Sequence, residues 1–163
     1  MRIALVLALA LPSALSAQAP SPEALAGLRR ITVAVEQASP ASVEAGVDTA
    51  GIRRRAEERV RRLGLTIAPA AAPDSAAGVL YLNVFAATNA DRDWYAAHVE
   101  VEVMQRVTMD RTPDARLFAM TWQAPARLRV VRPARLAGEV QQVVDEMLDE
   151  FASAWTAANP PGR

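Results

Sequence analysis

Alternating apolar and polar residues mark a series of strands along the chain. Period-two alternation runs through residues 31–36, 79–86, 95–109 and 117–123, and side chains two apart lie on the same face of a strand. A short apolar stretch at 65–68 adds one more strand. Both faces of 79–86 are largely apolar, which is typical of a strand in the middle of a sheet. We therefore expect a mixed, mostly antiparallel sheet of about five strands.

The same alternation predicts which side chains share a face of the sheet. In the third strand Leu80 and Val84 lie on one face, and Tyr81 and Phe85 lie on the other. If the first face is packed against helices, the two aromatic rings point away from them. In the fifth strand we expect one shared face for three residues, Phe118, Met120 and Trp122.

Two segments carry an apolar stripe at helical spacing. The first spans 48–63, where Asp48 or Thr49 is available as N-cap and Gly64 is placed to end the helix. The second runs from about Leu136 to the Asn159-Pro160-Pro161 sequence. The stripe of the first helix consists of Ile52, Ala56, Val60 and Leu63.

These elements predict an α+β fold with two layers. Their order is a strand, a helix, four further strands and a helix, with the long stretch 37–46 as a loop. A helix between the first two strands implies that those strands are parallel, whereas short loops between the later strands imply antiparallel hairpins. Two amphipathic helices and one sheet bury their apolar sides together when both helices lie on one face of the sheet. Residues 124–133 either extend the fifth strand or form a loop.

The amino-terminal residues have the three parts of a secretory signal peptide. Arg2 supplies a positive charge, residues 3–11 are apolar, and small residues follow. The apolar run is shorter than the roughly 20 residues that span a bilayer. We expect cleavage after Ala17, or alternatively after Ala19. The predicted organisation is a signal peptide at 1–17, a linker at 18–27, one domain at 28–159 and a tail at 160–163, in an exported protein that is periplasmic or secreted.

Composition narrows the classes of function. The chain has 163 residues and no cysteine, which excludes disulfides, thiolate zinc sites, cysteine nucleophiles and a lipid anchor on cysteine. Without Arg2 there remain 17 Arg against 18 Asp and Glu, a formal charge of about −1. This balance gives no electrostatic drive toward nucleic acid. After signal cleavage we expect no transmembrane segment.

Residues that could support catalysis are few. His98 shares a face of the fourth strand with Glu100 and Glu102, residue types that bind metal ions. Alternate strand residues lie roughly 6.5–7 Å apart, however, so three in a row seldom converge on one ion. Asp91 and Asp93 form a second candidate pair, in a loop beside aromatic residues. Because none of the common catalytic motifs occurs, we expect no catalytic, cofactor or metal site; the alternative is a metal-assisted or carboxylate-dependent enzyme at His98 or at Asp91 and Asp93.

Two surfaces are candidates for binding a partner. The first helix carries Arg54, Arg55, Arg61 and Arg62 on its polar face, and guanidinium groups bind phosphate, as in anionic lipid headgroups. The competing interpretation is a solvated face that complements the acidic outer face of the last helix. Three i,i+4 pairs also absorb charge on this helix, namely Arg54–Glu58, Glu57–Arg61 and Glu58–Arg62.

The second candidate surface is the wetter face of the sheet, with Tyr81 and Phe85. Exposed aromatic rings on a sheet often mark a contact with a partner or within a homodimer. The long loops could equally cover these rings. The expected partners are therefore an envelope protein, an anionic lipid headgroup or a second copy of the chain.

Several short motifs resemble those of a loosely defined group of exported bacterial proteins of unknown function. They are V-A-V-E at 33–36, R-R-L-G-L at 61–65, Y-L-N-V at 81–84, T-W at 121–122 and F-A-S-A-W-T-A-A-N-P at 151–160. In its element order the domain also resembles small α/β sandwiches of cell-envelope assembly proteins, such as the amino-terminal domain of the Tol-system periplasmic protein and the lipopolysaccharide-assembly lipoprotein. The resemblance implies a compartment and an architecture but no site. The expected function is a non-enzymatic exported binding or assembly module.

Overall fold

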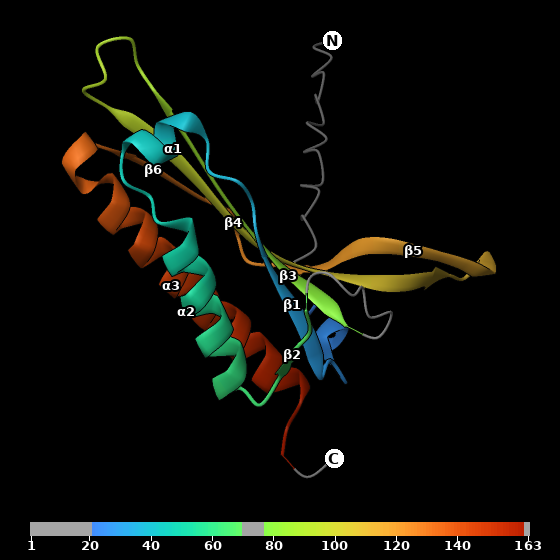
Figure 1. Ribbon diagram of the computed structural model, residues 1–163. Helices are drawn as coiled ribbons and strands as arrows, with labels where there is room; N and C mark the ends of the chain where they lie inside the picture. The colour runs from blue at the N-terminus through green and yellow to red at the C-terminus, as the bar shows by residue number, and fades with distance from the viewer. Residues whose placement is uncertain (1–20, 70–76, 162–163) are drawn as a thin grey trace, which may run out of the picture.

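The computed structural model describes residues 21–69 and 77–161, which form one sheet and a layer of helices (Figure 1). The predicted signal peptide and its cleavage site lie outside these residues. The two long helices, α2 (Thr49–Arg62) and α3 (Pro133–Ala158), lie side by side on the same face of the sheet. The predicted two-layer α+β architecture is therefore confirmed.

The sheet has the strand order β2-β1-β3-β4-β5, and β6 also pairs with β4. Its strands are β1 (Arg30–Val35), β2 (Thr66–Ile67), β3 (Gly78–Thr88), β4 (Tyr95–Met109), β5 (Thr112–Gln123) and β6 (Arg127–Val131). β1 is parallel to β2 and β3, whereas β4 is antiparallel to β3, β5 and β6. The predicted parallel pairing of the first two strands and the central position of the third are both correct.

β5 and β6 form one interrupted strand along the same edge of β4. The amide of Ala124 still donates to the Val101 carbonyl oxygen at 3.0 Å, and pairing resumes at Arg127 opposite Val99. Pro125 lies in the interruption. Proline has no N–H to donate to a neighbouring strand, so the pairing with β4 is broken at this residue. The stretch at 124–133 thus contains a strand, which the sequence left undecided.

The ends of the long helices coincide with residues that favour helix termini. The Asp48 carboxylate accepts from the Gly51 amide at 2.8 Å, and Gly64 follows α2 with a φ of 82°, in the left-handed region that glycine adopts readily. α3 begins at Pro133, earlier than the predicted Leu136, because proline is favoured in the first turn of a helix. No described helix combines the length and apolarity that a bilayer span requires.

A short helix, α1 (Pro40–Glu44), occupies part of the predicted loop. The Ser39 hydroxyl caps it by accepting from the Ser42 amide at 3.2 Å, and Pro40 starts its first turn. Ser39 also donates to the Ala86 carbonyl oxygen at 2.9 Å, which holds α1 against the end of β3. The sequence did not predict α1, because the Ser and Pro residues that cap and start this helix are equally typical of loops.

The core lies between the sheet and the two long helices. Trp122 and Phe151 meet edge to face with ring centroids 5.6 Å apart. Fully buried side chains come from both layers, including Ile31, Leu80, Leu82, Val101, Val103, Val60, Leu136, Val144 and Met147. Burial of this apolar surface is the main term that stabilises the domain.

One predicted face assignment is wrong. Trp122 is buried opposite Val103, whereas Phe118 and Met120 are about half exposed on the other side of the sheet. A register shift between Val103 and Met104 places an extra residue in β5 at this point. A β-bulge of this kind reverses the alternation on one side of it, so Trp122 and Met120 face opposite ways although they are two residues apart.

The folded part begins within the segment predicted as a linker. A 3₁₀ helix, η1 (Pro22–Leu25), packs against α3, and Leu25 is fully buried. The Asn159 side chain accepts from the Gly27 amide at 2.9 Å and donates to the Leu25 carbonyl oxygen at 3.0 Å. Prolines and small residues make this segment look like a linker, but a single buried leucine makes it part of the core.

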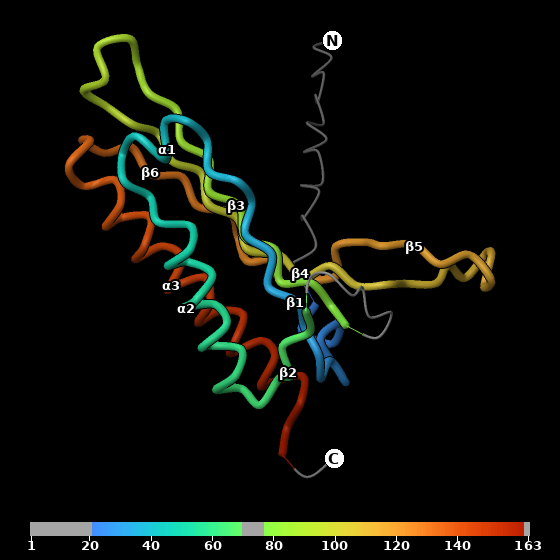
Figure 2. The backbone as a smooth tube through the Cα atoms, viewed as in Figure 1, coloured from blue at the N-terminus to red at the C-terminus, as the bar shows by residue number. Residues whose placement is uncertain are grey.

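The hairpin formed by β4 and β5 extends beyond the rest of the sheet (Figure 2). β3 begins at Gly78 and pairs with β4 as far as Met104. From Gln105 onward β4 pairs with β5 alone. Figure 2 shows this part of the hairpin leaving the body at an angle. We call residues 105–120 the arm.

Candidate functional site

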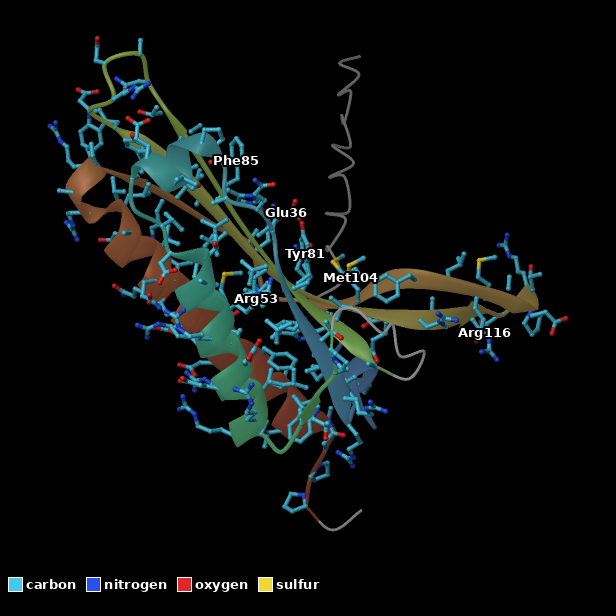
Figure 3. The ribbon with its side chains drawn as sticks, viewed as in Figure 1. Glu36, Arg53, Tyr81, Phe85, Met104 and Arg116 are labelled. Carbon is cyan, nitrogen blue, oxygen red and sulfur yellow. The ribbon has the colours of Figure 1, made fainter. Side chains whose placement is uncertain are left out.

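The sheet face opposite α2 and α3 is the candidate site, and we call it the open face. Figure 3 shows Phe85, Tyr81 and Glu36 on this side and Arg53 on the side of the helices. Phe85 is 53% exposed. The predicted outward direction of Tyr81 and Phe85 is correct, and no described helix covers them.

Three carboxylates lie near the middle of the open face. Glu36 follows β1 and accepts a hydrogen bond from the Tyr81 hydroxyl. Glu100 accepts from the Asn83 amide at 3.1 Å, and Glu102 accepts from the Gln123 amide at 3.2 Å. These partners are uncharged, so the negative charges of the three carboxylates are not neutralised by them.

The local environment shifts the pKa of two groups on this face. The hydrogen bond to Glu36 is the largest cause that raises the pKa of Tyr81 to about 12, because ionising the phenol would remove the donated proton beside a carboxylate. Loss of hydration, followed by the charge of Glu100, raises the pKa of Glu102 above its ordinary value. Tyr81 therefore stays a neutral hydrogen-bond donor at physiological pH.

His98 lies beside this group of carboxylates but is not enclosed by it. Its Nε2 atom is 3.9 Å from the nearer Glu100 oxygen, and the imidazole side chain is 40% exposed. It is paired across the strands with Phe85 on one side and Leu128 on the other. Among the described residues, no three His, Asp or Glu side chains are arranged to hold a metal ion. The contacts of His98 are those of a solvated side chain on the surface of the sheet.

The end of the open face nearest α1 is apolar. Leu128 is 62% and Val130 is 60% exposed, and both belong to β6. Phe85 lies on β3, and His98 of β4 lies between it and Leu128. A shallow hollow adjoins the open face at Glu36 and is lined by Glu36, Gln37, Ala38, Pro40, Val43 and Glu44. This end therefore exposes one aromatic ring and two branched aliphatic side chains.

The arm continues the open face away from the body. Figure 3 places Met104 where the arm meets the body and Arg116 far out along it. The cross-strand pairs Met104–Met120 and Arg106–Phe118 lie on the same side as the open-face residues of β4. The arm therefore presents methionine, phenylalanine and arginine side chains side by side.

The arginines of α2, the other predicted surface, are engaged in ion pairs. Arg55 lies 3.6 Å from the Asp145 carboxylate of α3, and Arg59 contacts Asp149. Arg61 pairs with Glu57 at 2.9 Å and Arg62 with Glu58 at 3.9 Å, which are two of the three predicted i,i+4 pairs. In place of the third, Arg54 pairs with Asp48 at 3.4 Å.

The loop with Asp91 and Asp93 does not bring its carboxylates to the middle of the open face. Asp93 accepts from the Asn89 amide at 2.5 Å, a bond within the loop. Arg92 has a positive φ of 56° and pairs with Glu44 of α1. Nearby, the guanidinium of Arg132 stacks 4.3 Å above the Trp94 ring. These contacts hold the loop in place, as in an ordinary ordered turn.

The sequence pattern did not point to several open-face residues. Asn83 lies on β3, Gln123 lies on β5 and Glu36 directly follows β1, and only the pairing register brings them near Glu100 and Glu102. Leu128 and Val130 belong to the stretch whose structure was left open. Their alternation with Arg127 and Arg129 was the one available signal of a strand there.

Comparison with known proteins adds little to this geometry. No family model matches the chain, and no curated protein sequence does. Among solved structures, the chain is similar to a variant PelC dodecamer from Paraburkholderia phytofirmans, with 16% identity over 84% of this chain and 92% of that chain and a TM-score of 0.40. A minor lipoprotein from Acinetobacter baumannii matches with 10% identity over 81% and 93%, at a TM-score of 0.37. These likenesses concern the general arrangement of elements.

Proposed function

We propose that this chain is an exported, non-enzymatic binding module, and that its open face is the surface that binds a protein partner. Export is supported by the signal-type residues at the amino terminus. The binding surface carries exposed apolar side chains next to carboxylates that have no guanidinium partner within the described residues. A mixture of exposed rings and polar groups is typical of protein–protein contacts.

The observation that carries this proposal is the exposure of Phe85, Leu128 and Val130 on one continuous face. All three are more than half exposed, and they lie on β3 and β6, the two neighbours of β4. Clustered apolar side chains at a sheet surface cost hydration free energy until a partner covers them. A partner for this face should therefore supply apolar side chains.

The charge of the open face narrows the kind of partner. The three carboxylates repel rather than attract a phosphate headgroup at neutral pH. The arginines of α2, which suit phosphate, are paired with carboxylates of α2 itself or α3 or with the capping Asp48. We therefore favour a protein surface with basic and apolar residues over an anionic lipid.

Site-specific photo-crosslinking tests this proposal. A photoreactive phenylalanine analogue at position 85 is expected to form covalent adducts with a partner in the cells that produce the protein. The matched control places the same analogue at Arg62, which is 68% exposed at the end of α2. No adduct at position 85, or the same adducts from both positions, would show that the open face is not the binding surface.

The enzyme alternative has its own measurement. A stoichiometric metal ion in the purified protein that is lost in His98→Ala would support a metal-assisted site at His98. The binding proposal predicts instead that His98→Ala leaves metal content unchanged and changes only the adduct yield from position 85, because His98 lies between Phe85 and Leu128.

A further inference from the structure

The arm has no covering element among the residues that the structure describes. Beyond Met104 it is a two-stranded ribbon, and its anchor lies at its root, where the Gln105 amide donates to the Ala24 carbonyl oxygen at 2.8 Å and to Thr121 at 2.7 Å. A two-stranded hairpin alone gains little stability in water. A ribbon of this length that exposes apolar side chains is typical of an element that is completed by another surface.

Exposed apolar side chains are concentrated on the arm and the open face. Nine large hydrophobic residues are exposed in the described part of the chain, and seven of these lie on the two surfaces. On the arm, Phe118 and Met120 lie on the side that continues the open face, Leu117 lies on the other side opposite Val107, and Met109 lies near the turn; the open face contributes Phe85, Leu128 and Val130. Both surfaces therefore need apolar cover.

The arm and the open face also differ in their charged side chains. Eight arginine–carboxylate ion pairs occur among the described residues, and none includes a residue of the arm or the open face. The side of the arm that continues the open face carries Arg106 and Arg116, with Asp110 and Asp114 at or near its turn. The open face carries Glu36, Glu100 and Glu102. Arg106 and Arg116 are thus complementary to the carboxylates of the open face, while Asp110 and Asp114 offset part of the arm's positive charge.

The spacing of the two surfaces is also compatible. Both are faces of twisted β-ribbons, where side chains two apart are roughly 6.5–7 Å from each other. Phe118 lies opposite Arg106 on the arm, and Phe85 lies one step from Glu100 on the open face. Two such faces pack about 10 Å apart with their side chains interleaved. Aromatic rings and charged side chains therefore alternate at similar intervals on the arm and on the open face.

We infer that the open face binds a second copy of this chain, whose arm lies across it. This inference rests on the proposed function of the open face and names its partner. In the contact Phe118 and Met120 of one copy cover the apolar side chains of the next, and Arg106 and Arg116 approach Glu36 and Glu100. Because the arm and the face are different patches, the contact repeats from copy to copy unless two copies exchange arms.

A charge-exchange experiment tests this contact. By sedimentation velocity the purified wild-type protein is expected to form dimers or larger assemblies. An arm variant, Arg106→Glu with Arg116→Glu, and a face variant, Glu36→Arg with Glu100→Arg, should each raise the dissociation constant about tenfold or more. Mixing the two variants should restore assembly, because each reversed surface then meets its complement.

Three results would overturn the inference. They are a monomeric wild-type protein, assemblies that persist in both variants, and a mixture of variants that stays dissociated. Arg62→Glu on α2 is the matched control and should leave assembly unchanged. Circular dichroism and thermal unfolding confirm that each variant is folded. If the face variant is not folded, Phe85→Ser with Leu128→Ser replaces it and should also dissociate the wild-type assembly.

The two proposals fail in different ways. If the wild-type protein is monomeric and the analogue at position 85 forms adducts with another protein alone, the open face binds a partner but that partner is not a second copy. If position 85 forms no adduct at all, the proposed function fails as well. Adducts between two copies of the chain that map to the arm support both the proposed function and the inference about the second copy.

Discussion

Glu102 lies in the middle of the open face, between Tyr81 on β3 and Gln123 on β5. Loss of hydration and the neighbouring Glu100 charge raise its pKa. A carboxyl group with a higher pKa in the folded than in the unfolded state resists ionisation on folding. Above the unfolded pKa, its charge therefore lowers the free energy of unfolding.

Glu102→Gln should accordingly stabilise the protein at neutral pH, by less than about 1 kcal/mol for a partly exposed position. The gain should vanish as the pH falls below the ordinary carboxyl pKa of 4.5, because Glu102 is then protonated in both states. Urea unfolding at neutral and at acidic pH measures both values. Equal stabilisation at both would show that the charge of Glu102 carries no penalty.

At the scale of residues, part of the open face followed from the sequence. Tyr81 and Phe85 were predicted to point outward because alternation within one strand determines the face. Glu36 was not, because its position depends on how β1 aligns with β3. Trp122 was wrongly grouped on one face with Phe118 and Met120, since one extra residue at the bulge reverses the alternation without changing the composition of β5.

At the scale of elements, the arm should be separable from the body. Replacing residues 106–118 with Asn-Gly joins the paired residues Gln105 and Ala119 through a two-residue hairpin turn. The arm contributes no residue to the buried core, so the free energy of unfolding should change by less than about 1 kcal/mol. Self-association should be lost. Chemical unfolding and sedimentation velocity measure the two effects.

A large loss of stability in this variant would mean that the arm supports the body. A stable variant that still assembles would place the contact between copies elsewhere. The two measurements together therefore separate a structural role of the arm from an interaction role.

Elements with strong local signals were the ones that the sequence predicted well. β4 has the predicted bounds, and α2 has the predicted cap at Asp48 and the predicted end at Gly64. α1 was taken for a loop because its five residues are too few for a helical stripe. The arm was not foreseen as a projection, because the alternation of β4 continues unchanged past the point where its neighbour β3 begins.

At the scale of the whole molecule, Asn159 joins the first and last described elements. Its side chain bonds to the backbone of Gly27 and Leu25 at one end of the chain and to the Trp155 carbonyl oxygen of α3. Asn159→Ala leaves these backbone groups without that partner and should lower the free energy of unfolding by about 1–2 kcal/mol. Urea unfolding measures the loss.

Asn89→Ala, in the exposed loop at 89–94, serves as a comparison, because the side-chain bonds of Asn89 stay within that loop. It should cost less than Asn159→Ala. An equal or larger effect of Asn89→Ala would contradict a special role for the bond between the two ends of the domain.

The joining of η1 to the end of α3 also determines when the domain can fold. Leu25 enters the core beside a helix that is complete at Ala158, so the first turn has no place to pack until almost the last residue has been made. A chain that is not yet complete therefore lacks this stabilising contact. If the protein is exported as we propose, the contact between η1 and α3 forms only after the carboxyl-terminal residues have been made.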